Sequence, residues 1–217
     1  VTISGVRVPF FLRLGNRARP FLPDGPKPGM GTFRNVTINN LVATGTGSIG
    51  CSITGLPGHL VENVTLSNLS LEFEGGGKKE LTDQQVPERP DAYPESSMFG
   101  DLPGYGLYCR HVQGLKIAGV RLSTLTADLR HAVVCDDGRD VEISGLSVPA
   151  ARGAAALVRF SQVADAVIRG CRAREAADVF LHVDGDTTQC VVLLDNDITT
   201  VQRVVEATAA VPAMASF

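Results

Sequence analysis

Two short segments of the sequence carry side chains that could do chemistry on a saccharide. They are GLYCRH (106–111) and AVVCDD (132–137), each built on alternating apolar residues. An aromatic ring can stack on a sugar face, a guanidinium can hold a uronate carboxylate, and carboxylates can bind hydroxyl groups. The candidate substrate-binding residues of these segments are Tyr108, Arg110, His111, Asp136 and Asp137.

The adjacent carboxylates Asp136 and Asp137 match a glycosidase acid and base in residue type only. Neighbouring residues of a strand point to opposite sides, so this pair is not expected to face one glycosidic bond. Arg110, which we expect beside Asp136, favours the ionised carboxylate, whereas a general acid needs a raised pKa. We therefore assign no catalytic residue, and a modest Arg110–Asp136 surface ion pair is the simpler interpretation.

Two further groups of residues could contact a ligand or anchor a loop. Arg13 and Arg17 lie at the predicted end of a strand, where they could bind an acidic substrate or hold the chain that follows. Tyr93 and Glu95 lie in the proline-rich segment 75–104, which is too long for a tight turn. Long loops on a regular scaffold carry function or cap sheet edges, and both interpretations stay open for this segment.

The composition argues against several function classes. The 20 Lys and Arg residues are outnumbered by 23 Asp and Glu residues, so non-specific nucleic-acid binding is not expected. No run of 18 apolar residues predicts a membrane-spanning helix. The five cysteines form no CxxC pair and the four histidines are scattered. We therefore predict free buried thiols, no metal site and no cofactor.

The segments NVTINNL (35–41) and NVTLSNL (63–69) are nearly the same sequence, 28 residues apart. Equivalent apolar positions recur at 36, 64, 115, 141, 166 and 191, with spacings of 28, 51, 26, 25 and 25 residues. The spacing of 51 is one period plus an insertion. A further copy, VTISGV, opens the chain at residues 1–6. The strict alternation within each copy indicates strands rather than helices.

Each period also contains a second alternating run, such as IGCSIT (49–54) or VFLHV (179–183). One short strand cannot bury its apolar face alone, but stacked repeats can, because each strand pairs with its equivalents above and below. The sequence therefore predicts an all-β, single-stranded parallel β-helix of about seven coils. At a bend between strands, Asn40 is expected to stack on Asn68. The predicted inward column contains Ile38, Leu66, Ile117, Ile143 and Ile168.

Counting back from each repeat copy aligns the second strands with one another. Cys109 then lies beside Cys135 in an inward column, too far apart for a disulfide because parallel neighbours are about 4.8 Å apart. His111 lies over Asp137 in the same alignment. The outward columns are Tyr108–Val134–Arg159 and Arg110–Asp136–Ser161. The alignment therefore predicts one surface patch that contains Tyr108, Arg110, His111, Asp136, Asp137 and Arg159.

We interpret residues 1–217 as one domain with inserted loops at 15–31 and 75–104. The sequence begins inside a repeat copy, with neither Met nor a signal peptide, so we expect a truncated solenoid from a longer protein. Its exposed first coil is expected to promote self-association. A β-sandwich is less consistent with the sequence, because hairpin signals such as Asn-Gly between paired runs are lacking.

Residues 45–76, GTGSIGCSITGLPGHLVENVTLSNLSLEFEGG, closely resemble the late coils of glycoside hydrolase family 28, the polygalacturonase and rhamnogalacturonan-hydrolase group. In that family a GLP turn precedes a strand of the type I-x-N-I/V-T-x-x-N-I. Residues 91–115, DAYPESSMFGDLPGYGLYCRHVQGL, followed by VVCDD, resemble its bacterial branch. The likeness covers roughly residues 1–146.

The resemblance implies a right-handed, pectin-lyase-like β-helix and inverting hydrolysis of an acidic pectic polysaccharide. The family keeps its catalytic carboxylates in NTD and DD motifs, followed by GHG and RIK motifs, all before the GLP turn. This chain has no NTD, GHG or RIK, and its DD at 136–137 follows the GLP turn, so no catalytic residue carries over. The expectation is an inactive C-terminal portion of a secreted or periplasmic hydrolase. A non-catalytic carbohydrate-binding or structural β-helix and a polysaccharide lyase remain alternatives.

Overall fold

The computed structural model describes residues 1–208, an all-β arrangement with one short 3-10 helix. The strands are β1 Thr2–Ser4, β2 Phe11–Arg13, β3 Phe33–Thr46, β4 Cys51–Thr54, β5 Val61–Gly75, β6 Gly104–Thr126, β7 His131–Ser144, β8 Ser147–Val148, β9 Val158–Arg169, β10 Arg172–Ala173, β11 Ala177–Asp184, β12 Gln189–Leu194 and β13 Val201–Ala207. The 3-10 helix η1 spans Lys79–Asp83. The predicted domain extends to residue 217, and its last residues, 209–217, lie outside this description.

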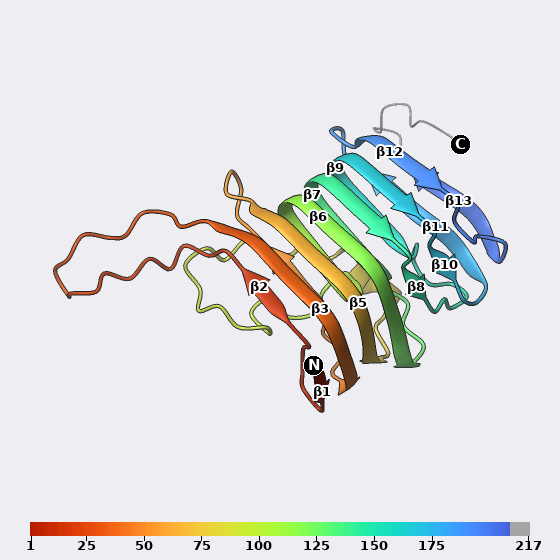
Figure 1. Ribbon diagram of the computed structural model, residues 1–217, viewed down its shortest axis with the longest axis horizontal. Helices are drawn as coiled ribbons and strands as arrows, with labels where there is room; N and C mark the ends of the chain where they lie inside the picture. Colours follow the sequence, from red (N-terminus) through yellow and green to blue (C-terminus); the bar gives the residue numbers. More distant parts are fainter. Residues whose placement is uncertain (209–217) are drawn as a thin grey trace.

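Strands one repeat apart in the sequence lie side by side in the structure (Figure 1). The ladders between the strands of residues 1–208 are parallel, and one row runs β1-β3-β5-β6-β7-β9-β11-β13. Val36 pairs with Val64, Val64 with Leu115, and Val141 with Ala166, which is the predicted register. This large parallel sheet is consistent with a β-helix.

The predicted inward column lies in the core. Leu66, Ile117, Ile143 and Ile168 pair in one row and are each 0% exposed. Ile38 is half-buried, because no described strand pairs with the outer edge of β3 beside it. Burying a side chain of this size contributes roughly 1.5–3 kcal/mol, so continuous apolar rows hold the stacked strands together.

Two of the five cysteines lie side by side in a second inward row. Cys109 pairs with Cys135 across β6 and β7, and both are buried. All five cysteines of the chain are free thiols, which confirms the prediction that no disulfide links Cys109 to Cys135. Cys190 is exposed, so the expectation of burial is wrong there. Its φ of 53° puts a bend at the second residue of β12, and its side chain faces away from the core.

Asparagines form ladders at the bends of β3 and β5. Asn40 and Asn68 have φ values of 56° and 52°, in the left-handed region that Asn tolerates. The Nδ2 of Asn68 donates to the Oδ1 of Asn40, which confirms the predicted stacking. A second ladder was not predicted: the Nδ2 of Asn63 donates to the Oδ1 of Asn35 at 3.1 Å. Gly119, the next residue beyond Asn68 in the stack, keeps the bend with a φ of 61°.

The segment 76–103, here called the strap, connects β5 to β6 and contains η1. Its apolar side chains pack on residues that point outward from β6 and β7. The strap therefore caps this outer face, which is one of the two interpretations left open by the sequence. The buried cluster beneath it contains Val86, Met98, Phe99, Leu102, Tyr108 and Val134.

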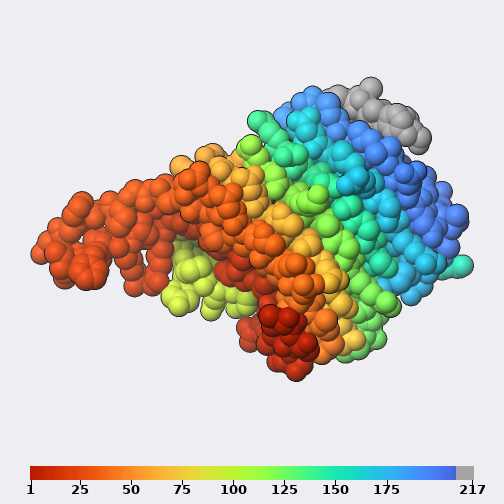
Figure 2. Space-filling model, viewed as in Figure 1, coloured from red at the N-terminus to blue at the C-terminus, as the bar shows by residue number. Residues whose placement is uncertain are grey.

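The segment 14–32, here called the arm, joins β2 to β3 and projects from the stacked strands (Figures 1 and 2). The side chain of Phe21 is fully exposed on it. The base of the arm contacts the strap. The backbone N–H of Asn16 donates to the carbonyl of Pro90 at 2.8 Å, and the guanidinium of Arg17 lies 4.7 Å from the ring centroid of Tyr93.

Candidate functional site

The structure brings Arg110, His111, Asp136 and Asp137 together on the outer face of β6 and β7. The Nε of Arg110 lies 3.2 Å from the Oδ2 of Asp136, and the two residues are paired in register. The Nδ1 of His111 lies 2.5 Å from the Oδ2 of Asp137. The Arg110–Asp136 ion pair and the placement of His111 over Asp137 were both predicted, and both are confirmed.

The strap adds Glu88, which joins these two pairs into one cluster. One Glu88 oxygen, Oε1, lies 2.7 Å from an Nη of Arg110 and 2.9 Å from the Nε2 of His111. Arg110 also donates to the carbonyl of Val86 at 2.6 Å. The sequence did not predict Glu88, because a loop without periodicity gives no register. Its contacts make the cluster an anchor for the strap.

Asp136 and Asp137 lie on one outer patch, as the alignment of the second strands predicts, but the pKa of Asp136 differs from expectation. The φ of 56° at Asp137 takes the chain out of strand geometry, so its side chain reaches the same outer cluster as Asp136 rather than the opposite face. Burial raises the pKa of Asp136, although Arg110 and His111 oppose it. Arg110 lowers this pKa as expected, but the net shift is upward because removal from water outweighs the guanidinium. Each carboxylate is nevertheless held by a cationic or imidazole partner.

Tyr108 and Arg13 support the strap instead of facing solvent. Tyr108 is 2% exposed, so the strap leaves little of its ring free to stack on a sugar. Its column does point outward, but the strap covers it. Arg13 donates to the carbonyl of Gly55 at 2.6 Å and to the carbonyl of Glu88. Its guanidinium also lies 5.4 Å from the ring centroid of Phe99.

The remaining predicted residues lie apart from this cluster. Arg17 and Tyr93 stack on each other where the arm meets the strap. Glu95 is exposed, and its backbone carbonyl accepts from the N–H of Met98 at 3.0 Å. Among residues 1–208, the Glu95 side chain has no hydrogen-bond or ion-pair partner. The predicted binding set is therefore divided between a buried anchor and a contact at the base of the arm.

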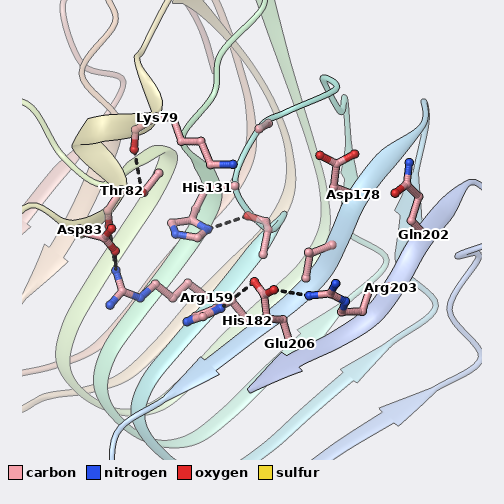
Figure 3. Close-up of a pocket in the computed structure, with 14 residues that line it drawn as sticks. Lys79, Thr82, Asp83, His131, Arg159, Asp178, His182, Gln202, Arg203 and Glu206 are labelled. Atoms are coloured by element: carbon pink, nitrogen blue, oxygen red, sulfur yellow. Dashed lines mark hydrogen bonds and ion pairs between the residues drawn. The ribbon is translucent and has the colours of Figure 1, made fainter. Parts of the chain in front are cut away.

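A hollow of about 580 Å³ opens on the outer face of β9, β11 and β13, with η1 of the strap as one wall (Figure 3). Its lining is mostly charged and polar. These side chains have the planar donors and acceptors that bind saccharide hydroxyls and carboxylates. The lining includes Lys79, His131, Arg159, His182, Arg203 and Glu206.

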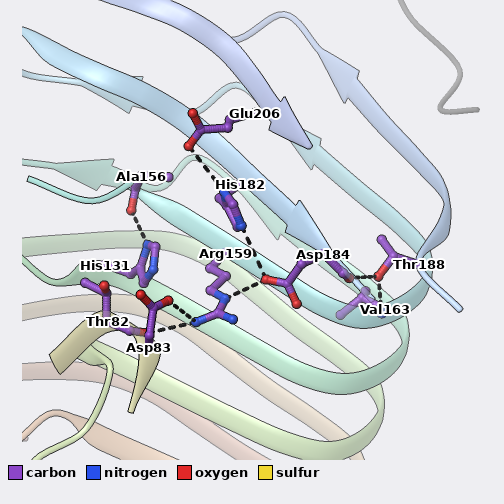
Figure 4. Close-up of polar contacts among 10 residues, drawn as sticks. All are labelled: Thr82, Asp83, His131, Ala156, Arg159, Val163, His182, Asp184, Thr188 and Glu206. Atoms are coloured by element: carbon purple, nitrogen blue, oxygen red, sulfur yellow. Dashed lines mark hydrogen bonds and ion pairs between the residues drawn. The ribbon is translucent and has the colours of Figure 1, made fainter. Parts of the chain in front are cut away.

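A chain of ion pairs crosses the floor of this hollow (Figure 4). The Nε of Arg159 donates to the Oδ2 of Asp184 at 2.7 Å. The Nε2 of His182 lies 3.4 Å from the same oxygen, and its Nδ1 lies 3.4 Å from the Oε2 of Glu206. Hydrogen bonding to Asp184 raises the pKa of His182. Burial alone would raise the pKa of Asp184, but hydrogen bonds from His182, Ser161 and Arg159 lower it.

His131 lies at the inner wall of the hollow and is 4% exposed. Its Nδ1 is 2.7 Å from the carbonyl oxygen of Ala156, so the neutral ring carries its proton there and donates to that oxygen. Burial lowers the pKa of His131 to about 4. The neutral ring therefore has an Nε2 that can accept a hydrogen bond.

Sequence reasoning missed His182 and Glu206, although a usable signal was present. The outward column Tyr108–Val134–Arg159 continues through them, because His182 pairs with Arg159 on one side and with Glu206 on the other. Extending the alternation of VFLHV (179–183) by one more repeat would have placed both residues in the column of Arg159. The hollow was not predictable in this way, since it also needs the strap.

A smaller cleft of about 210 Å³ adjoins the hollow along the edge of the strap. Asp83 and Arg159 line both spaces, so they stand at the junction. Three of the predicted binding residues, Tyr108, Arg110 and Asp136, line the smaller cleft. The two spaces together offer an extended polar surface that runs from the strap anchor to β13.

Within residues 1–208, no three His, Cys, Asp or Glu side chains are grouped so as to hold a metal ion. None of the helices described there is long and apolar enough to cross a membrane. The arrangement of the hollow suits binding of a polar, charged small molecule or saccharide. No protein-family model matches this chain, and comparisons with curated proteins and with solved structures gave no match.

Proposed function

We propose that this chain is the C-terminal portion of a secreted or periplasmic, polygalacturonase-like glycoside hydrolase. In this proposal the parallel sheet is a right-handed, pectin-lyase-like β-helix of about seven coils. The regular return of strands at intervals of 25–28 residues supports it. The GLP turn also supports the proposal. It lies between β4 and β5, and within it Leu56 and His59 pair with each other in a short antiparallel bridge.

The proposed role of this portion is to bind an acidic pectic saccharide without cleaving it. The observation that carries the proposal is the polar hollow beside the strap, whose lining provides three cationic side chains, Lys79, Arg159 and Arg203, beside the carboxylates of Asp83, Asp178 and Glu206. A uronate carboxylate pairs well with such groups, and sugar hydroxyls pair with imidazoles and carboxylates. Neither a membrane nor a nucleic acid is part of this proposal.

The absence of hydrolysis in this proposal follows from the state of Asp136 and Asp137. Inverting hydrolysis needs one carboxylic acid and one carboxylate that holds a water, with about 6.5–9.5 Å between them. Here each aspartate contacts a partner, Arg110 or His111, and Glu88 bridges these partners. The same observation favours a second candidate, a β-helix module that binds carbohydrate in a protein without hydrolase activity.

Two measurements on the purified chain test this function. Isothermal titration with trigalacturonate and with neutral galactotriose should give binding of the acidic sugar only. Reducing-sugar assays on polygalacturonate should detect no release. Release that the double variant Asp136→Asn, Asp137→Asn abolishes would show a catalytic role for this pair. Failure to bind trigalacturonate would overturn the binding role.

A further inference from the structure

The guanidinium of Arg159 makes short hydrogen bonds to Asp184 and to the backbone of Thr82, but only a long contact to Asp83. Its Nε donates to Asp184, whose side chain is 16% exposed, at 2.7 Å. Its Nη1 donates to the carbonyl of Thr82 at 2.7 Å. The same Nη1 lies 3.7 Å from the Oδ1 of Asp83, beyond hydrogen-bonding distance, and the Asp83 side chain is 91% exposed. Within the described chain, Nη2 has no hydrogen-bond or ion-pair partner.

Asp83 is therefore a weak partner for a well-positioned cation. An exposed ion pair of this kind contributes little, typically under about 1 kcal/mol. Asp184 fixes the orientation of Arg159 from below, so the guanidinium is already in place for a second carboxylate. A bidentate carboxylate on a fixed guanidinium binds better than one at 3.7 Å, because two parallel N–H···O bonds can form.

Lys79 supplies a second cation on the same wall. It begins η1, the 3-10 helix that ends at Asp83, so both side chains come from one short element of the strap. Figure 3 shows the Lys79 side chain reaching into the hollow, on the side of Arg159 and His131. Among residues 1–208 it makes no ion pair, which leaves its charge available to a ligand.

We propose that Arg159 and Lys79 form a subsite for the carboxylate of an acidic sugar, and that Asp83 is the internal carboxylate which such a ligand displaces. The inference rests on the proposed function, because it names the ligand group that the hollow recognises. The junction position supports it, because Asp83 and Arg159 line both the 580 Å³ hollow and the 210 Å³ cleft. A saccharide carboxylate that displaces Asp83 from Arg159 would therefore lie where the two spaces meet.

The test compares the affinity of trigalacturonate with that of its fully methyl-esterified form, which has a similar size and no carboxylates. Asp83→Asn keeps the shape of the side chain and removes its charge. It should tighten trigalacturonate binding roughly two- to fivefold and leave the ester unaffected. Asp91→Asn is the matched control, an exposed aspartate elsewhere in the strap, and should change neither affinity.

Two further variants test the cations. Arg159→Gln should weaken trigalacturonate binding about tenfold or more, and Lys79→Gln should weaken it roughly two- to fivefold. Arg159→Gln removes the guanidinium partner of Asp184, so this variant can also destabilise the fold. Lys79 and Asp83 are exposed, so their variants should fold normally and report on binding alone. Wild-type binding that is indifferent to Asp83→Asn and Lys79→Gln would overturn this inference alone. No binding by the wild-type chain would overturn the proposed function with it.

Discussion

Acidification should destabilise the fold through His131 before it affects the carboxylates. The ring is buried against Ala156, and its pKa falls from the ordinary 6.5 to about 4 in the folded chain. The unfolded chain therefore binds more protons between these two values. Stability from this group is complete above pH 6.5 and is lost as the pH falls toward 4. The difference between the two pKa values, at about 1.4 kcal/mol for each unit, gives a loss of about 3 kcal/mol in the free energy of unfolding.

Most other groups with shifted pKa values affect stability in different pH ranges. The pKa of His182 is raised, so its contribution is complete below pH 6.5 and is lost as the pH rises through its folded value. The pKa of Asp184 is lowered, so its contribution is present above the ordinary 3.8 and is lost as the pH falls below that. The raised pKa of Asp136 acts in the opposite sense, since its burial costs less once the carboxyl is protonated, so His131 is isolated by comparing the wild type with a variant that lacks this ring.

The assay is urea unfolding followed by far-UV circular dichroism, because the chain contains no Trp. Between pH 6.5 and 4.5 the wild-type chain should lose about 2–3 kcal/mol more than His131→Asn. This variant can still donate an amide N–H to Ala156 but does not titrate. His59→Asn changes an exposed turn histidine and should behave as wild type. Equal pH dependence in the wild type and His131→Asn would refute the reasoning.

Three further outcomes are expected. Glu88→Gln should weaken the bonds to Arg110 and His111 and speed proteolysis within the strap, with about 1–2 kcal/mol lost from unfolding; unchanged cleavage would contradict the anchor. Asn68→Gly should cost about 1 kcal/mol by removing the ladder bond, and Asn68→Ala should cost about 1 kcal/mol more because of its positive φ; equal costs would argue against strain at this bend. A thiol reagent should label Cys190 rapidly in the native chain, with the other cysteines reacting only on unfolding; fast labelling of a second cysteine would contradict their burial.

Periodicity predicted the parts of the fold that repeat. The column containing Ile117 and Ile143 follows from alternation alone, because burial of one strand face fixes the register to the residue. The contact between Asn40 and Asn68 follows from the same register. Stacking of His111 over Asp137 needed only one further alignment.

Contacts made by the strap and the arm were not predictable in this way. Tyr108 lies in the outward column that the sequence predicts, yet the strap buries it. Glu88 reaches Arg110 from a segment that has no repeat to place it. One side of the hollow around Arg159 is a strand column that the repeat predicts, and the other side is the strap, which has no repeat. The position of the hollow therefore could not be predicted from the sequence.

The measurement that tests the account most directly is an amide chemical-shift map of trigalacturonate titrated into the ¹⁵N-labelled chain. We predict saturable shifts concentrated at Arg159, His182 and Arg203 and in residues 79–83 of the strap. Recovered trigalacturonate should be intact. Shifts concentrated instead on the outer face of β3 and β5, or no shifts at saturating ligand, would contradict the assignment of the hollow as the saccharide-binding site.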